Sequence, residues 1–139
     1  KIPELISFRK GLPVYAQRCA ILQAIESHQV VVVSGETGSG KTTQIPQYIL
    51  EDAHEKNKFC NIVCTQPRRI SAIAAADRVS EEKGEDTGGI VGYQIRLEKE
   101  CGENTRLLFC TTGILLRKLH LDPNLDKLTH VIIDEVHER

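Results

Sequence analysis

The sequence predicts an α/β fold in which a mostly parallel sheet is flanked by helices. Short apolar runs alternate along the chain with longer segments whose apolar side chains have helical spacing. Several of these runs are rich in Val and Ile, as in residues 30–33 and 131–133, which is typical of strands buried on both faces. The connections are long enough to hold a helix, and such crossovers join parallel strands.

The expected elements follow from this alternation. Pro3 and Gly11 predict weak structure over residues 1–12, an incoming linker, so that the folded domain covers residues 13–139. Residues 98–105 are polar and predict a loop. The expected strands cover residues 30–33, 61–66, 90–97, 106–111 and 131–133, and the expected helices begin at residues 13, 42, 68 and 112. The apolar faces expected on the last two helices are Ala72, Ala75, Ala76 and Val79, then Ile114, Leu115, Leu116 and Leu119.

Composition excludes some classes of protein and leaves others open. The chain has 139 residues, 40% of them hydrophobic, and a net charge of −1, so nucleic-acid contact would need a local basic face. It holds no run of eighteen apolar residues, so we expect no membrane span. It begins with Lys1 and lacks methionine, so we expect a piece of a longer protein.

The cysteines favour a reducing compartment, the cytoplasm or the nucleus. There are five, an odd number, without a C-x-x-C pair, which is typical of free thiols. Cys60 and Cys64 could be imagined as metal ligands, but no second pair stands at ligand spacing, so this alternative is the weaker one.

Residues 35–42 read Gly-Glu-Thr-Gly-Ser-Gly-Lys-Thr and match the pattern G-x-x-x-x-G-K-[ST]. This pattern predicts a loop whose backbone N–H groups surround the phosphates of a nucleotide, since glycines let the chain curl closely. Lys41 would add a positive charge and Thr42 a hydroxyl ligand for Mg²⁺. A glycine-rich turn without a ligand is the competing interpretation. The expected nucleotide-binding residues are Gly35, Glu36, Thr37, Gly38, Ser39, Gly40, Lys41, Thr42 and Thr43.

A second acidic motif follows the last expected strand. Ligands of parallel sheets bind at the carboxyl ends of strands, where both the loop and Asp134–Glu135 fall. Asp134 would hold Mg²⁺, and Glu135 would orient and deprotonate the attacking water. The alternative is a surface pair that caps a loop.

Four segments resemble motifs of one family. Residues 35–42, 65–72, 111–117 and 134–139 are similar, in order and spacing, to motifs I, Ia, Ib and II of the DEAH/RHA RNA helicases. Residues 92–98 resemble the family's Gly-Tyr-x-[IV]-Arg segment, and Val136 resembles the RNA helicase A side of the family. The resemblance implies a RecA-like P-loop NTPase domain that uses Mg²⁺ and ATP, or any other nucleoside triphosphate.

The resemblance also implies roles for single residues. Arg68, Arg69 and Thr111 would lie along the backbone of single-stranded RNA. Arg78 would stack on the nucleotide base. The catalytic residues would be Lys41, Glu135 and His137. Of these, His137 would couple hydrolysis to a neighbouring domain. A solvated helix face is the competing interpretation for the arginines.

Upstream of the loop, Gln17 has a spacing from Pro13 that some helicases use to read adenine, and a solvent-facing glutamine is the alternative.

An ATP-dependent RNA helicase is therefore the expected function. The family also needs a Ser-Ala-Thr motif after motif II and a second RecA-like domain with arginine fingers, so the resemblance implies a fold that is incomplete at the C-terminus. We therefore expect the 139 residues alone to be a poor ATPase and no helicase. A non-catalytic RNA or protein docking module is one alternative, against which the intact motif residues speak. A P-loop kinase or transport ATPase is the other, and the segments containing Arg68, Arg69 and Thr111 speak against it.

Overall fold

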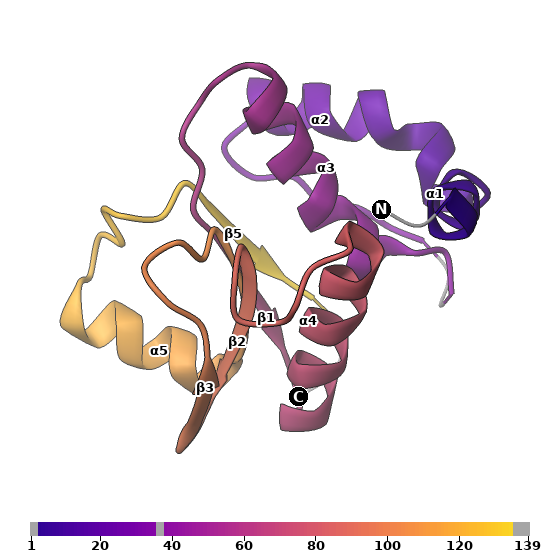
Figure 1. Ribbon diagram of the computed structural model, residues 1–139. Coiled ribbons are helices and arrows are strands. Elements are labelled where there is room, and N and C mark those ends of the chain that lie inside the picture. The colour runs from indigo at the N-terminus through magenta and orange to yellow at the C-terminus, as the bar shows by residue number, and fades with distance from the viewer. Residues whose placement is uncertain (1–2, 36–37, 135–139) are drawn as a thin grey trace.

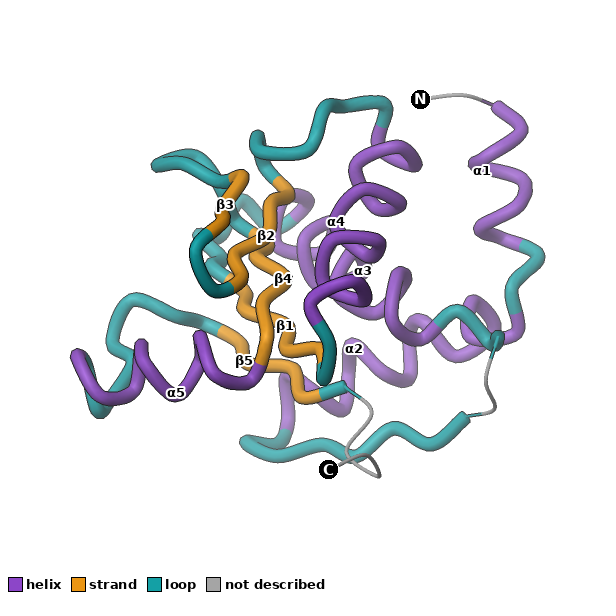
Figure 2. Tube along the Cα trace, turned by 90° about the horizontal axis from the view of Figure 1, so that it is seen from below, coloured by secondary structure: helices purple, strands orange, loops and turns teal. Residues whose placement is uncertain are grey.

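The computed structural model describes residues 3–35 and 38–134. Five strands form one sheet (Figure 1). Their order is β3-β2-β4-β1-β5, which can be followed in Figure 2. All neighbouring strands are parallel except β2 and β3, which form an antiparallel hairpin. The predicted α/β fold with a mostly parallel sheet is confirmed. The strands are β1 (Ile62–Gln66), β2 (Val91–Ile95), β3 (Glu98–Glu100), β4 (Leu107–Thr111) and β5 (His130–Ile133).

The helices cover the two faces of the sheet unequally. Helices α1, α2, α3 and α4 lie on one side of the sheet, and α5 lies on the other (Figure 2). In the described ranges, none of the helices is long and apolar enough to cross a membrane. The helices are α1 (Pro3–Lys10), the 3-10 helix η1 (Pro13–Gln17), α2 (Arg18–Ser27), α3 (Lys41–Glu55), α4 (Arg69–Lys83) and α5 (Thr112–Leu121).

Strand β1 separates two apolar cores. All five of its residues are buried. Ile62 and Cys64 belong to the larger core, which lies under α2, α3 and α4, while Val63 belongs to the smaller core under α5. The predicted small-residue face of α4 is confirmed, since Ala72, Ala75, Ala76 and Val79 are all buried.

The strand predicted over residues 30–33 is wrong. These residues have no strand structure, and Val30 and Val32 are 79% and 86% exposed. A β-branched run favours a strand only where a neighbouring strand accepts its hydrogen bonds. In the part of the chain that the structure describes, β5 ends the sheet beside β1, and residues 30–33 pair with neither.

Three smaller expectations are also wrong. Residues 3–10 form α1 instead of a weakly structured linker, because Arg9 ties this helix to Glu51 of α3 at 2.8 Å. The expected loop after β2 contains β3, whose Glu98 carboxylate accepts a hydrogen bond from the Tyr93 hydroxyl at 2.5 Å. Leu116 is 60% exposed, because α5 buries Ile114 and Leu115 against the sheet.

Candidate nucleotide-binding site

The loop before α3 has the backbone that its glycines predict. Gly38 and Gly40 have φ angles of +85° and +96°, in the left-handed region that side chains rarely adopt. A Cβ atom on Gly40 would lie 2.9 Å from Leu12 Cδ1 and 3.2 Å from Val14 Cγ1. The close approach of residues 12–14 therefore adds a second reason why glycine stands at position 40.

Two contacts fix the loop in place. The Val14 N–H donates to the Ser39 carbonyl at 3.1 Å, and the Lys41 ammonium donates to the Gly35 carbonyl at 2.6 Å. Because α3 begins at Lys41, the free N–H groups of its first turn face the loop, where an anion is favoured.

A cavity of about 230 Å³ opens at this loop. Its lining includes Gly35, Gly38, Ser39 and Lys41, and also Gln17 from η1. The Ser39 hydroxyl is buried, and within the described residues it has no hydrogen-bond partner. An orphaned hydroxyl beside glycine amides and an ammonium fits a phosphate group, which would accept from all three.

The predicted metal-binding residues meet under the loop. The Thr42 hydroxyl donates to Asp134 Oδ2 at 2.5 Å, although 92 residues separate the two in the chain. Asp134 directly follows β5, and its N–H donates to the Thr65 carbonyl of β1 at 3.3 Å. A hydroxyl and a carboxylate are hard oxygen ligands of the kind Mg²⁺ takes alongside substrate phosphates, so this pair fits the ion.

The described ranges hold no group of three His, Cys, Asp or Glu side chains that would form an all-protein metal site. Burial raises the pKa of the Cys60 and Cys64 thiols, which disfavours the thiolate that a metal needs. The weaker alternative, a metal site at these cysteines, therefore gains no support from the structure.

A third residue contacts the acidic side of the site. Gln66, the last residue of β1, is 3% exposed, and its side-chain amide donates to Asp134 Oδ2 at 2.8 Å. Sequence reasoning assigned it no role. The available signal was a polar residue at the carboxyl end of an apolar strand.

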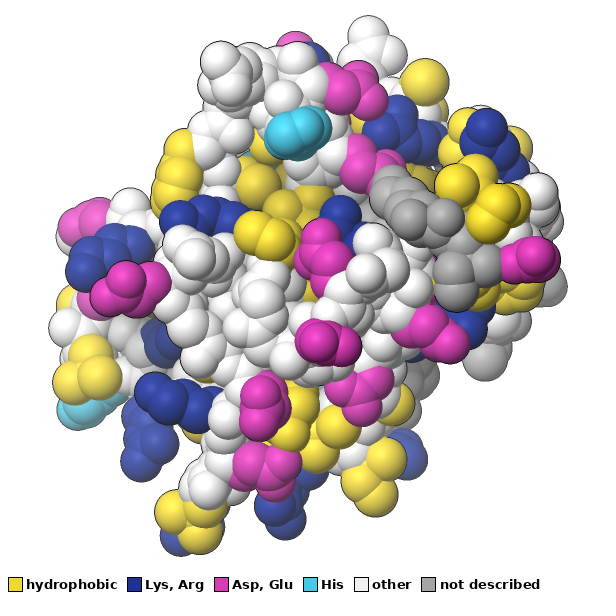
Figure 3. All heavy atoms as spheres, viewed as in Figure 1, with side chains coloured by type: hydrophobic (Ala, Val, Ile, Leu, Met, Phe, Trp, Pro, Cys, Tyr) yellow, Lys and Arg dark blue, Asp and Glu magenta, His cyan; other side chains and the backbone are white. Residues whose placement is uncertain are grey.

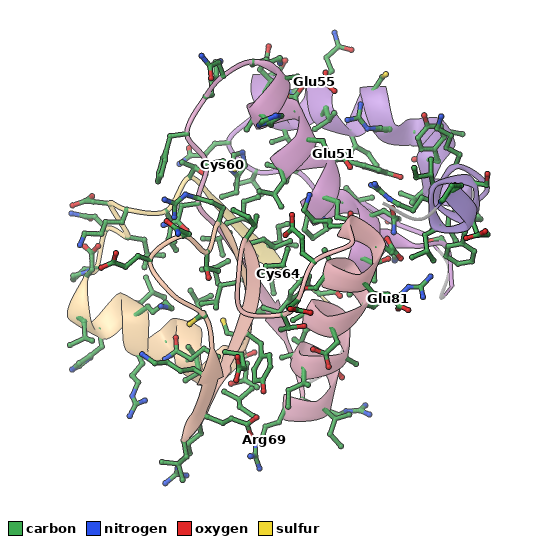
Figure 4. All side chains as sticks on the ribbon, in the orientation of Figure 1. Glu51, Glu55, Cys60, Cys64, Arg69 and Glu81 are labelled. Carbon is green, nitrogen blue, oxygen red and sulfur yellow. The ribbon has the colours of Figure 1, made fainter. Side chains whose placement is uncertain are left out.

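The residues expected to contact RNA lie at the same edge of the sheet. Thr111 ends β4 opposite Gln66, and Arg68 and Arg69 follow β1 after Pro67. Both arginines are exposed, and Arg69 points away from the body of the protein (Figure 4). Acidic and basic side chains are mixed over the face seen in Figure 3, as the net charge of −1 leads one to expect.

Arg78 lies on α4 within a cluster of charged and aromatic side chains. Its guanidinium carbon is 5.2 Å from the centre of the Phe8 ring, and its Nε donates to Glu82 at 2.8 Å. The residues that line the cavity at the loop do not include it. Its stacking on a nucleotide base stays a prediction.

Glu82 is a buried carboxylate that sequence reasoning also missed. It is 1% exposed, and its Oε1 accepts from the amides of Gln44 at 2.9 Å and Gln47 at 2.8 Å. Gln44 in turn accepts from Arg9 Nε at 2.6 Å. This network joins α1, α3 and α4 directly behind the phosphate loop.

Other expected residues lie outside the described ranges. Glu36, Thr37, Glu135 and His137 are among them, so their roles stay predictions.

Comparison with known proteins decides the family. Residues 15–139 match the family described as DEAD/DEAH box helicase. The chain belongs to this family. It is 58% identical over 138 residues to the DExH-box ATP-dependent RNA helicase DExH3 of Arabidopsis thaliana, and 53% identical over 148 residues to the ATP-dependent RNA helicase DHX29 of Homo sapiens. These matches cover 98% and 100% of this chain but only 12% and 11% of the two relatives. The chain thus spans about a tenth of the length of the curated relatives it matches.

Membership of the DEAD/DEAH box helicases explains why the loop and Asp134 converge. The residue range of the match includes both, together with the segments of Arg68–Arg69 and Thr111. The expected helicase resemblance is therefore confirmed at the level of the family.

Proposed function

We propose that this chain is the nucleotide-binding and RNA-gripping part of an ATP-dependent RNA helicase. The observation that carries the proposal is the 2.5 Å contact between Thr42 and Asp134, which joins the phosphate loop to the acidic motif. The printed names of the relatives, which are ATP-dependent RNA helicases, support it.

In this function the loop binds the phosphates of ATP, or of another nucleoside triphosphate. Amides of residues 38–43 and the Lys41 ammonium stabilise negative charge on the β and γ phosphates. Thr42 and Asp134 would hold Mg²⁺, which shields the phosphates and polarises the bond that is cleaved. Glu135 orients the attacking water and takes its proton.

The residues expected to contact RNA lie at the same edge of the sheet as this chemistry. Arg68, Arg69 and Thr111 hold the phosphodiester backbone of single-stranded RNA, so that the bases stay free. A second RecA-like domain supplies the far wall of the nucleotide site and arginine fingers, which in related NTPases contribute a rate factor of about a thousand or more. His137 couples the two domains.

The test is the ATPase rate of the full-length protein with and without single-stranded RNA. We expect RNA to stimulate the wild-type protein, and Glu135→Gln to reduce kcat by at least about a hundredfold while nucleotide binding persists, because the general base is lost. Glu103→Gln, in an exposed loop, is the matched control and should keep the wild-type rate. A rate that is indifferent to RNA would refute the helicase function.

A further inference from the structure

Gln66 occupies a junction between the phosphate loop, the acidic motif and the RNA-contacting segment. Its amide nitrogen and the Thr42 hydroxyl both donate to the same oxygen, Oδ2 of Asp134, at 2.8 Å and 2.5 Å. An ionised carboxylate only accepts hydrogen bonds, so the amide of Gln66 must turn its nitrogen toward Asp134. The position of this carboxylate is therefore determined from two sides, by α3 and by β1.

The burial of Gln66 makes this contact rigid. The side chain is 3% exposed, and the same nitrogen lies 3.8 Å from Cys64 Sγ, which is fully buried. The backbone supports the contact, because β1 and β5 are parallel with Thr65 opposite Ile133, one residue before the two interacting side chains. The amide is buried and hydrogen-bonded within the described residues, so it keeps one orientation, and a shift of the strand end moves the carboxylate.

The chain that follows Gln66 leads directly to the expected RNA contacts. Pro67 separates Gln66 from Arg68, the residue before α4, and Arg69 begins that helix. Because proline has a restricted φ angle, the backbone at Pro67 absorbs little of a displacement at Arg68 or Arg69, and the end of β1 moves with it. Gln66 is thus one hydrogen bond from Asp134 and two residues from Arg68.

We propose that Gln66 is a positioning residue, which orients Asp134 for the metal–nucleotide complex and transmits movement of the Arg68–Arg69 segment to it. The inference rests on the proposed function, since it assumes that Asp134 serves a bound nucleotide. Gln66 touches neither phosphate nor metal in this role, and it acts only through the carboxylate that it holds.

The test measures how the Mg²⁺ concentration controls binding of a fluorescent, non-hydrolysable ATP analogue to the full-length protein without RNA. Gln66→Met has nearly the same volume but cannot donate a hydrogen bond. We expect it to raise the Mg²⁺ concentration for half-maximal binding about tenfold, as for loss of one hydrogen bond to a charged group. Binding in excess EDTA should stay unchanged, because the loop amides and Lys41 are intact.

A second variant and a control separate positioning from simple damage. Gln66→Asn keeps the amide but is one methylene shorter, so it should shift the Mg²⁺ requirement in the same direction. Gln94→Met, the same change near the carboxyl end of β2, should leave the requirement at the wild-type value. We also expect both Gln66 variants, but not Gln94→Met, to lower the ratio of RNA-stimulated to basal kcat.

The outcomes are distinguishable. An unchanged Mg²⁺ requirement in both Gln66 variants would overturn the inference, and so would an equal loss of binding with and without Mg²⁺, which indicates general damage to the loop. If the wild-type protein itself fails to bind the analogue, the proposed function fails instead.

Discussion

Removing the buried carboxylate of Glu82 should destabilise the fold strongly. In Glu82→Ala, the amides of Gln44 and Gln47 and the Nε of Arg78 each lose an acceptor at 2.8–2.9 Å. The Arg9 side chain is only 11% exposed, and its Nε lies 3.7 Å from Glu82 Oε1. Removing one partner of such a buried charge pair costs about 3–5 kcal/mol, because the remaining buried groups are left without compensation. We expect the free energy of unfolding to fall by an amount in this range.

The neighbouring Glu81 offers a matched control. It carries the same charge and also contacts Arg78, at 3.2 Å, but it is 60% exposed and lies on the outer side of α4 (Figure 4). Exposed ion pairs contribute about 0–1 kcal/mol, so Glu81→Ala should change stability little.

Urea-induced unfolding followed by circular dichroism measures both variants under the same conditions. An equal loss of unfolding free energy in Glu82→Ala and Glu81→Ala would refute the reasoning, because the buried Glu82 network would then stabilise the fold no more than an exposed ion pair.

Three further predictions concern the loop, the RNA contacts and pH. Gly40→Ala should abolish binding of the ATP analogue, as measured by fluorescence, because the φ of +96° and the 2.9 Å approach to Leu12 both exclude a Cβ; wild-type affinity would contradict this. Arg69→Ala should weaken binding of single-stranded RNAs equally, whatever their sequence, and should reduce the steepness of log affinity against log salt concentration by about 0.7. Arg96→Ala, at another exposed arginine, is the comparison variant. An unchanged slope would count against a phosphate contact at Arg69. Burial lowers the pKa of His130, so the folded state binds its proton less readily than the unfolded state, and stability should fall as pH drops below about 6.5. His130→Asn should flatten the dependence of the free energy of unfolding, measured with urea, on pH between about 7.5 and 5.5. A slope equal to that of the wild type would mean that other groups cause the pH dependence.

Local patterns were enough to predict most of the fold. Apolar spacing, Pro67 and the glycines are signals that act over a few residues. They predicted strand β1, helix α3 after the phosphate loop, and the small-residue face of α4. The strand expected over residues 30–33 failed because a β-ladder needs a neighbour, and apolar character cannot supply one. Residues 3–10 became helical because Arg9 finds its partners on α3, more than thirty residues away.

For the site, local patterns were enough to predict which chemical groups are present and at which edge of the sheet they lie. The glycines and Lys41 predicted a phosphate loop, and the position of Asp134 after an apolar strand predicted its place at the sheet edge. Which of these groups touch depends on packing between distant parts of the chain. Gln66 reaches Asp134 across 68 residues, and Glu82 joins Gln44 across 38, contacts that strand order and helix packing create and no local spacing encodes. Buried polar side chains acquire their roles from such distant partners, because burial makes an unmatched donor or acceptor costly.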